Sequence, residues 1–370
     1  MRTDYLTEAL LTLLRVGLWE KSNENDLPAL QACDLSGANL NDNSFMSLVW
    51  GEVLKLAEEQ SVVGLVTAGL EKLPMGILPL TEKLKFAGRC QLIEQRNVVM
   101  NCLVAELWLR LKDAGIKVLL VKGQGVSQCY ERSLWRKSGD VDFLVDKDNY
   151  KRTIGILKPI ADNSFSGGEY SKEFCLNIDA FLIEVHGSLR TGLSSRIDKE
   201  VDAVQKDTFA NGRYRVWHNG ETDVLLPAPN NDVFFVFTHF IKHFYKEGMH
   251  LRQLCDWCRL MWVFRKEIDS VLLEKRLQRA GLMYEWKSFS ALAVSTLGMP
   301  IKAMPLYEDN ECWHKKGQQI MNIIMNNNGS NKMVYTFRLV TVFPWKTICY
   351  LPSILLNVNR LKIKERLRHK

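Results

Sequence analysis

Apolar residues recur at a spacing close to 3.6 over the first 115 residues of this 370-residue chain. The recurrence is clearest at Leu10, Leu11 and Leu14 and within 54–63 and 103–111. This spacing predicts amphipathic helices. Breaks rich in Pro, Gly, Asn and Asp interrupt it at Pro28, 34–43 and 73–79. We therefore expect four or five helices in this region.

Between residues 116 and 228 the pattern changes to short runs rich in β-branched residues, separated by helix-like segments. Such runs predict strands. We expect strands over 117–121, 141–145 and 181–185, a candidate extra strand over 169–177, and a helix over 148–157 that packs on the sheet. Asn219-Gly220 suits a two-residue turn with positive φ values, so 214–218 and 221–226 are expected to form a hairpin.

Helical spacing returns after Pro227 and Pro229, with a helix expected over 231–245 that Asn230 or Asn231 can cap. The aromatic residues of this helix lie at helical spacing, which favours a buried core over stacking on nucleic-acid bases. They are Phe234, Phe235, Phe237, Phe240, Phe244 and Tyr245. The predicted fold class is α+β, with a helical N-terminal region over 1–115, a small mixed β-sheet core over 116–228 and a helical C-terminal region over 229–370.

The composition is that of a globular protein, with 46% hydrophobic and 25% charged residues. A net charge of +7 is compatible with phosphate-bearing partners but too mild for a dedicated nucleic-acid binder, and we find no DNA-binding motif. The nine cysteines are odd in number and scattered, which favours reduced thiols in a cytoplasmic protein. Cys255 and Cys258 have no second pair at zinc spacing, so we expect no metal there.

The N-terminal stretch carries Glu8 and Arg15 among its apolar residues, and we expect neither a signal peptide nor a membrane span. The tail from Arg360 has six basic residues and one acid in its last 11 positions. We interpret it as a solvated helix end, with a binding patch as the alternative. A soluble, cytoplasmic protein is expected.

Two aspartates lie two residues apart in Gly139-Asp140-Val141-Asp142-Phe143, within a run that is expected to form a strand. Residues two apart in a strand project from one face, so Asp140 and Asp142 lie side by side while Val141 and Phe143 point into the core. Paired carboxylates repel each other unless a cation lies between them. Mg²⁺ takes carboxylate oxygens together with substrate phosphates, so the pair is a candidate metal platform for a nucleoside triphosphate.

Two further features accompany this pair. Lys122-Gly123-Gln124-Gly125 follows a strand and precedes a helix-like stretch, where backbone N–H groups can hold phosphate oxygens, although such turns are often structural and the spacing is not that of a Walker loop. Glu184 lies in the apolar run 181–185 and shares its face with His186. A buried carboxylate needs a partner, which is either a metal ion or a structural salt bridge.

The expected helix over 231–245 places His239 and His243 four residues apart, on one face, and Arg252 and Asp256 repeat this spacing in the next helix. A zinc pair is one interpretation. Histidines packed at an interface between regions are the more common case, because a third zinc ligand would have to be assumed.

Together these residues resemble the polymerase-beta-like nucleotidyltransferase superfamily, which has a glycine turn, an Asp-x-Asp strand and a third acid on a later strand. The more detailed resemblance is to a bacterial family of uncharacterised nucleotidyltransferases and covers most of the chain. It rests on Lys122, Gly123, Tyr130, Arg136, Gly139, Asp140, Asp142, Glu184 and His186. Gln124 departs from the superfamily's Ser or Gly, and 16 residues separate Gly123 from Asp140, which weakens the phosphate turn more than the metal site.

The resemblance implies that Asp140 and Asp142 bind two Mg²⁺ ions and that Glu184 shares the ion that activates the acceptor. It further implies that Lys122, Gly123, Gln124 and Arg136 bind the triphosphate. It also implies that polar residues of the C-terminal region face the cleft and contact the base, the phosphates or the acceptor. These residues are His239, His243, Arg252 and Asp256.

The expected activity is Mg²⁺-dependent transfer of a nucleoside monophosphate from a triphosphate, taken to be ATP, to a hydroxyl or phosphate with release of pyrophosphate. His186 is a candidate contact to the acceptor and a candidate base. The acceptor stays open between a small molecule, a sugar or polymer precursor, a protein side chain and an RNA end. The alternative from another class is a catalytically inactive nucleotide-binding sensor or scaffold on the same fold.

Overall fold

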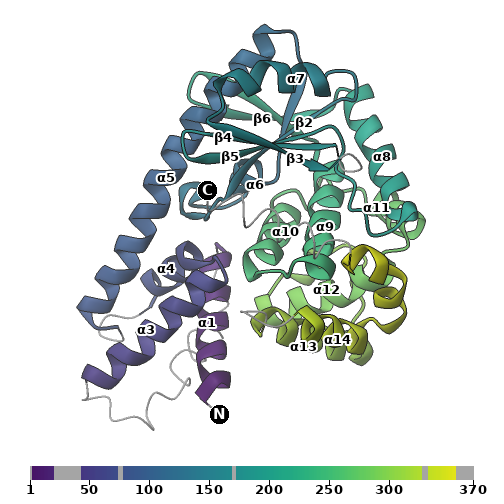
Figure 1. The fold of residues 1–370 in the computed structure, drawn as a ribbon. Helices are drawn as coiled ribbons and strands as arrows, with labels where there is room; N and C mark the ends of the chain where they lie inside the picture. Colours follow the sequence, from purple (N-terminus) through teal and green to yellow (C-terminus); the bar gives the residue numbers. More distant parts are fainter. Residues whose placement is uncertain (1, 21–42, 74–77, 169–171, 327–331, 356–370) are drawn as a thin grey trace.

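The computed structural model describes the whole chain except residues 1, 21–42, 74–77, 169–171, 327–331 and 356–370. The predicted breaks at Pro28 and 34–43, and the basic tail from Arg360, lie outside the described residues. A sheet with helices on both faces forms one part of the molecule, and helices at both ends of the chain form the rest (Figure 1). The predicted α+β fold is thus confirmed.

The N-terminal helices found in the described part of the chain are α1 (Arg2–Leu18), α3 (Asn43–Glu59), α4 (Val63–Glu71) and α5 (Leu80–Asp113). The 34-residue α5 runs from the far end of this helical group up to the sheet (Figure 1). Its C-terminal half buries Leu103, Leu107 and Leu111 against the sheet. The predicted helical N-terminal region is confirmed in these residues.

The main sheet is mixed and has the order β1-β2-β5-β4-β3. Its strands are β1 (Val118–Val121), β2 (Asp140–Val145), β3 (Asn163–Gly168), β4 (Glu173–Ile178) and β5 (Phe181–His186). The β2–β5 pair is parallel, and the others are antiparallel. The three expected strands and the candidate extra strand, β4, are confirmed. β3 was not expected, because its sequence Asn-Ser-Phe-Ser-Gly-Gly lacks alternating apolar residues. It lies at the edge of the sheet and therefore pairs with a neighbouring strand on one side only.

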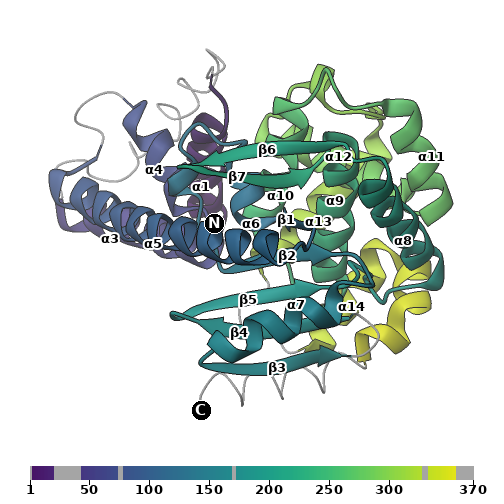
Figure 2. The same ribbon diagram turned by 90° about the horizontal axis from the view of Figure 1, so that it is seen from above.

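The hairpin β6 (Tyr214–Asn219) and β7 (Thr222–Pro227) turns at Gly220, whose φ is +59°, as predicted. It adds Trp217, Val224 and Leu226 to the apolar layer between the sheet and α5. The helix α7 (Tyr150–Leu157) covers the same layer through Leu157. The opposite face of the sheet meets the C-terminal helices, so the sheet is covered on both sides (Figure 2).

The C-terminal part is helical, as predicted. It contains α9 (Pro229–Lys246), α10 (Leu251–Val263), α11 (Ser270–Ala280), α12 (Met283–Leu297), α13 (Glu311–Met325) and α14 (Lys332–Val342), followed by helical residues 344–355. The predicted asparagine cap of α9 is wrong. Ala228 occupies the N-cap position and Pro229, which has no N–H to satisfy, begins the helix. The Asn230 and Asn231 amides instead donate to Glu267 O and Thr208 Oγ1.

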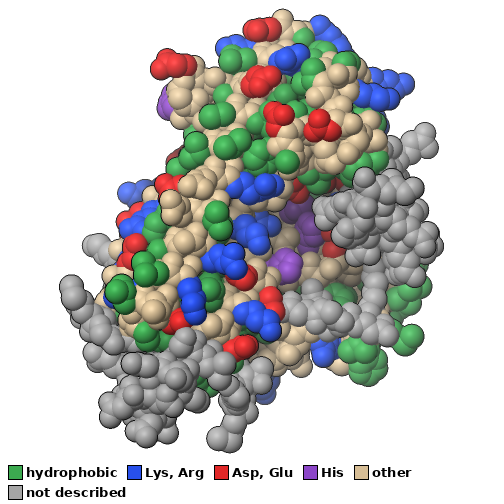
Figure 3. All heavy atoms as spheres, turned by 60° about the vertical axis from the view of Figure 1, so that its left-hand side comes forward, with side chains coloured by type: hydrophobic (Ala, Val, Ile, Leu, Met, Phe, Trp, Pro, Cys, Tyr) green, Lys and Arg blue, Asp and Glu red, His purple; other side chains and the backbone are tan. Residues whose placement is uncertain are grey.

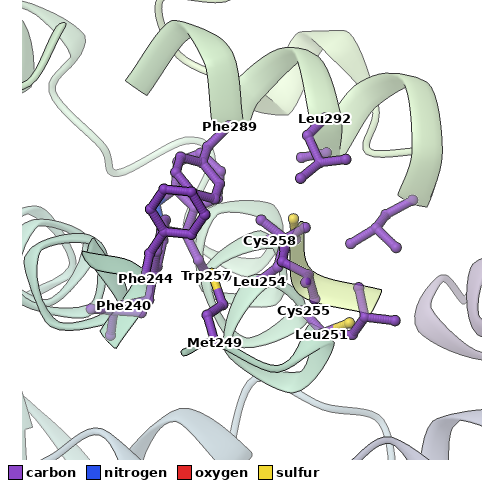
Figure 4. Close-up of a cluster of buried hydrophobic side chains, with 14 of the residues drawn as sticks. Phe240, Phe244, Met249, Leu251, Leu254, Cys255, Trp257, Cys258, Phe289 and Leu292 are labelled. Atoms are coloured by element: carbon purple, nitrogen blue, oxygen red, sulfur yellow. The ribbon is translucent and has the colours of Figure 1, made fainter. Parts of the chain in front are cut away.

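The aromatic residues of α9 are buried, as predicted. Phe240 and Phe244 pack against α10 and α12 (Figure 4). Cys255 and Cys258 are free thiols buried in this apolar cluster. The same core includes α1 and Trp19, which follows it and whose Nε1 donates to Leu297 O. The division into three regions stays a prediction, because one core joins both ends of the chain.

No helix in the described ranges combines the length and the hydropathy of a bilayer-crossing segment.

Candidate active site

The parallel pairing of β2 with β5 brings the sequence-predicted carboxylates together. Asp142 is the register partner of Glu184, and Leu144 is the partner of His186. Paired residues of neighbouring strands project from the same face, so Asp142 and Glu184 lie side by side. Val141 and Phe143 are buried in the layer beneath α5 on the other face, as predicted. The alternation of β2 thus places Asp140 and Asp142 on the face that meets the C-terminal helices.

Lys122 lies directly after β1 and contacts this carboxylate group. Its Nζ is 2.7 Å from Asp142 Oδ1. His186 Nε2 lies 2.7 Å from the same oxygen and 3.5 Å from Glu184 Oε2. Lys122 has φ +57°, a conformation that is costly for a residue with a side chain and that clusters at functional sites. Two cationic or hydrogen-bonding groups thus converge on one oxygen of Asp142.

The pKa values of the carboxyl groups diverge within this site. Burial alone would raise the pKa of Asp142, but Lys122 and the hydrogen bond from His186 outweigh it and hold this pKa well below its usual range. Burial and the neighbouring Asp142 raise the pKa of Asp140. Burial and the nearby Glu173 raise the pKa of Glu184 to about 8. Asp140, Asp142 and Glu184 therefore act together on the ammonium of Lys122, a surplus of acidic groups that is expected where a further cation binds.

The ligand atoms of Asp142, Glu184 and His186 lie within 4.8 Å of one another. Asp140 is not among these three but occupies the same face of β2, two residues earlier. Carboxylate oxygens are the ligands that Mg²⁺ prefers, and a site open to a cleft leaves room for water and phosphate ligands. The residues present therefore fit a divalent cation held by the carboxylates. Lys122 and His186 both contact Asp142 at this position.

The glycine turn divides into a part that faces the site and a part that does not. A side chain at Gly123, which has φ +32°, would place its Cβ 3.2 Å from Asp140 O. Gln124 is buried and turned toward α5, where its Nε2 donates to Asn97 Oδ1 at 3.1 Å. Ser127 Oγ lies 3.1 Å from Gln124 Oε1. The Gln124 side chain thus has a structural partner on α5.

A cleft of about 310 Å³ lies between this face of the sheet and the helices α9 and α10. Figure 3 shows a hollow in which histidine, acidic and basic side chains gather. Nine of the predicted site residues line the cleft: Lys122, Gly123, Arg136, Asp140, Asp142, His239, His243, Arg252 and Asp256. Glu184, His186 and Gln124 do not line it. A smaller recess on the other side of Lys122 and His239 includes His186, together with Glu173, Arg190 and Lys242.

Arg136 and Asp256 form a buried ion pair at the wall of the cleft. Arg136 Nε and Nη2 donate to the two carboxylate oxygens of Asp256 at 2.6 and 2.7 Å, and Tyr130 OH donates to Oδ1 at 2.8 Å. Burial would raise the pKa of Asp256, but the guanidinium of Arg136 outweighs it and lowers this pKa. Such a fork-to-fork pair fixes the orientation of Arg136.

Arg252 lies beside this pair on α10 and has a nitrogen that no group satisfies. Its Nη1 donates to Lys137 O at 3.0 Å, whereas its buried Nε has no hydrogen-bond partner. Burial and the like charge of Arg136 lower the pKa of Arg252, while Asp256 and Asp140 act in the opposite direction. A buried donor without a partner is costly, so an anion in the cleft would relieve this cost.

Histidines line the α9 wall of the cleft. His239 Nε2 and His243 Nε2 are 3.0 Å apart, and His243 Nδ1 is 2.9 Å from Glu247 Oε2. Burial and the charge of Lys122 lower the pKa of His239 well below its usual value. In the described part of the chain these histidines belong to no group of three or more candidate metal ligands. Both histidines line the cleft.

The sequence did not predict several residues of the cleft, namely Glu247, His250 and Gln253, or two residues of the smaller recess, Glu173 and Lys242. Glu247 continues the four-residue spacing of His239 and His243, and this signal was present in the sequence. Glu173 is an acid in an apolar strand, as Glu184 is, and its register partner is His186. Gln253 and His250 carry no such signal, because the start of α10 depends on where the chain turns after α9.

The sequence model of a family described as "Uncharacterised nucleotidyltransferase" matches residues 47–297, which is more than half of the chain. The match runs from within α3 to the end of α12 and therefore includes every predicted site residue. No curated protein and no solved structure shows a significant match to the chain.

Proposed function

This chain belongs to the uncharacterised nucleotidyltransferase family, and on this premise we propose that it transfers a nucleoside monophosphate from ATP to an acceptor hydroxyl or phosphate. The observation that carries the proposal is the in-register pair of Asp142 and Glu184 beside Asp140, at a cleft lined with cationic side chains. Carboxylates on two adjacent strands are a means of holding divalent cations against a polyphosphate.

In the proposed reaction the acceptor oxygen attacks the α-phosphorus of the triphosphate. The bond from the acceptor oxygen to phosphorus forms, and the bond from phosphorus to the oxygen that bridges to the β-phosphate breaks. Pyrophosphate leaves with the electron pair of that bond, and the acceptor proton passes to water or to a nearby base such as His186. Two Mg²⁺ ions, when bound, supply charge neutralisation and a lower acceptor pKa.

The protein groups divide this work. Asp140, Asp142 and Glu184 hold the cations. Lys122, whose Nζ contacts Asp142 at 2.7 Å, would neutralise the charge of the phosphates from this position. Gly123 lets the backbone approach the triphosphate, and the backbone N–H of Gln124 is the phosphate donor at that position, because its side chain is engaged with Asn97.

Arg252 contacts the triphosphate through its unsatisfied Nε. Arg136, whose Nη1 donates to Ser138 Oγ at 2.9 Å, adds its positive charge to the wall of the cleft. His239 and His243 form the wall that meets the base or the acceptor. A bidentate partner on one side of Arg136 means that it acts from a fixed position. We place the reaction in the cytoplasm, where triphosphates and reduced thiols coexist.

A catalytically inactive nucleotide sensor or scaffold is the second candidate. One observation favours it: Lys122 Nζ and His186 Nε2 both contact Asp142 Oδ1, so the acid already has internal partners. In that case the triphosphate would bind in the cleft without reacting. The three carboxylates argue for the transferase, because a binding module has no use for an acidic group that repels phosphate.

The experiment is incubation of the purified protein with Mg²⁺ and each labelled nucleoside triphosphate, with cellular metabolites, RNA and protein as acceptor pools. The control is the Asp140→Asn/Asp142→Asn variant, with its folding checked by circular dichroism. We expect transfer of label by the wild type alone. Triphosphate binding without transfer to any pool would instead establish the sensor, and absence of binding would contradict the assignment of the cleft.

A further inference from the structure

His239, His243 and Glu247 form a line of contacts along one wall of the cleft. Each lies four residues after the one before, at the C-terminal end of α9 and just beyond it, so the three side chains share one helix face. His243 Nδ1 is 2.9 Å from Glu247 Oε2, and His243 Nε2 is 3.0 Å from His239 Nε2. All three residues line the cleft together with Asp140 and Asp142. A path of hydrogen bonds therefore runs along the proposed reaction site.

The carboxylate of Glu247 decides where the protons of this path lie. An ionised carboxylate only accepts hydrogen bonds, so the neutral ring of His243 carries its proton on Nδ1 and accepts through Nε2. The proton between the two rings then belongs to His239 Nε2, which leaves His239 Nδ1 with a lone pair. No described residue forms a hydrogen bond with this nitrogen. The path thus ends in an unpaired base on a residue that lines the cleft.

His239 itself is a poor place for a positive charge. Burial lowers its pKa well below the usual value, and the charges of Lys122, His243, Lys242 and His186 act in the same direction. These groups lie after β1, on α9 and on β5, so they act on the ring from three elements. A proton taken up at Nδ1 is therefore passed on, from Nε2 to His243.

Glu247 provides the counter-charge at the other end of the path. Its carboxylate neutralises the imidazolium that forms at His243, and the side chains of Glu247 and His243 are 27% and 23% exposed. Water therefore reaches this end and takes the proton away. His186 is less suited to the same task, because it lines the smaller recess and its Nε2 contacts Asp142 Oδ1.

We propose that His239, His243 and Glu247 form a relay that removes the proton of the acceptor, and that the acceptor group is accordingly a hydroxyl and not a phosphate. The inference rests on the proposed nucleotidyl transfer and selects one of its two acceptor classes. A hydroxyl loses its proton when it attacks phosphorus. A phosphate monoester, with a second pKa of about 6, has already lost its proton at neutral pH. A path for that proton therefore serves the hydroxyl alone.

The relay moves one proton per turnover. As the bond from the acceptor oxygen to phosphorus forms, the hydroxyl proton moves to His239 Nδ1. The proton on His239 Nε2 moves to His243 Nε2, and pyrophosphate leaves with the electron pair of the broken bond. His239 is the catalytic residue of this relay, because it touches the acceptor. His243 and Glu247 are positioning residues that act through it.

The first test measures the tautomers in the free protein, by long-range ¹H–¹⁵N correlation spectra of ¹⁵N-labelled histidine. We expect the Nδ1–H form of His243 and the Nε2–H form of His239. Glu247→Ala removes the acceptor and should change the tautomer populations of both rings, although His243 separates His239 from position 247. The matched control is Asp223→Ala, which removes the carboxylate beside the exposed His218 and should change neither ring of the relay.

The second test identifies the linkage formed from ATP labelled at the α-phosphorus, with Mg²⁺ and the cellular pools as acceptors. We expect a phosphodiester, which ³¹P spectra distinguish from a phosphoanhydride. His239→Ala should lower the rate by about a hundredfold or more, and added imidazole should restore part of it, because imidazole replaces a base and not a packing contact. His218→Ala, on the exposed hairpin, should keep the wild-type rate.

The outcomes separate this proposal from the proposed function. A phosphoanhydride product, or the wild-type rate in His239→Ala, would overturn the relay and leave the transferase in place. An Nε2–H form of His243 in the wild type would overturn the relay as well, whatever the rates. Absence of transfer by the wild type to any pool would contradict the transferase itself, and the catalytic role of His239 with it.

Discussion

Asp256→Asn tests the ion pair that fixes Arg136 at the cleft. The two side chains are only 4% and 8% exposed and share two hydrogen bonds of 2.6 and 2.7 Å between Nε and Oδ1 and between Nη2 and Oδ2. Removing one charge of a buried pair leaves the other uncompensated and costs about 3–5 kcal/mol. Because both residues line a cleft that water enters, we expect the lower end, about 3 kcal/mol of unfolding free energy.

The assay is urea-induced unfolding followed by far-ultraviolet circular dichroism. The matched control is Glu311→Gln, which removes a pair with Lys315 whose side chains are 81% and 69% exposed; it should cost less than about 0.5 kcal/mol. Arg136→Met/Asp256→Asn should cost less than the two single changes together, since no charge is then left unpaired. Two results would refute the reasoning. One is a loss of unfolding free energy below about 1 kcal/mol for Asp256→Asn. The other is a double variant whose loss equals the sum of the losses of the two single variants.

The pH dependence of this difference has a definite sign. The folded protein lowers the pKa of Asp256 below its ordinary value of 3.8. A depressed carboxyl pKa stabilises the fold at pH values above the unfolded pKa, and this contribution is lost as the pH falls through the folded pKa. The free-energy gap between wild type and Asp256→Asn should therefore be constant above about pH 5 and shrink below about pH 4. A gap that grows in acid would contradict the ion pair.

Three further changes test the cleft. Arg252→Met should raise the KM for the triphosphate by about tenfold to a hundredfold, the value of one charged hydrogen bond. It should lower the unfolding free energy by only about 1 kcal/mol, because Nη1 loses its bond to Lys137 O while the buried Nε has no partner to lose; unchanged kinetics would remove Arg252 from the site. Gly123→Ala should lower the unfolding free energy by about 1–2 kcal/mol and lower kcat, because the added Cβ would lie 3.2 Å from Asp140 O at a φ of +32°. Wild-type stability and turnover in this variant would contradict the prediction. Gln124→Ala should cost about 1 kcal/mol by removing the bond to Asn97 while KM stays constant; a raised KM would mean that the side chain itself contacts the nucleotide.

The local sequence pattern was enough to predict the helices and strands and the two faces of β2. The two-residue period of β2 placed Asp140 and Asp142 opposite Val141 and Phe143, and the structure confirms the buried half of that prediction. Helical spacing likewise predicted the α9 stripe that carries His239 into the cleft wall. Both predictions needed only the geometry of one element.

Contacts between distant elements could not be predicted in the same way. The pairing of β2 with β5, which places Asp142 beside Glu184, depends on strand order, and strand order depends on which faces the helices bury. The Arg136–Asp256 pair joins residues 120 positions apart. Gln124 fits the spacing of a phosphate turn equally well whether its side chain faces the cleft or α5. Tertiary packing decides each of these cases.

The measurement that tests the central claim most directly compares ATP labelled at the α-phosphorus with ATP labelled at the γ-phosphorus, in the presence of Mg²⁺ and the acceptor pools. The account predicts that the α-label enters the acceptor and the γ-label leaves as pyrophosphate, and that Asp142→Asn abolishes both. Transfer of the γ-label to an acceptor would show a phosphotransferase and contradict the account. Release of γ-label as inorganic phosphate, with no α-label transferred, would contradict it as well.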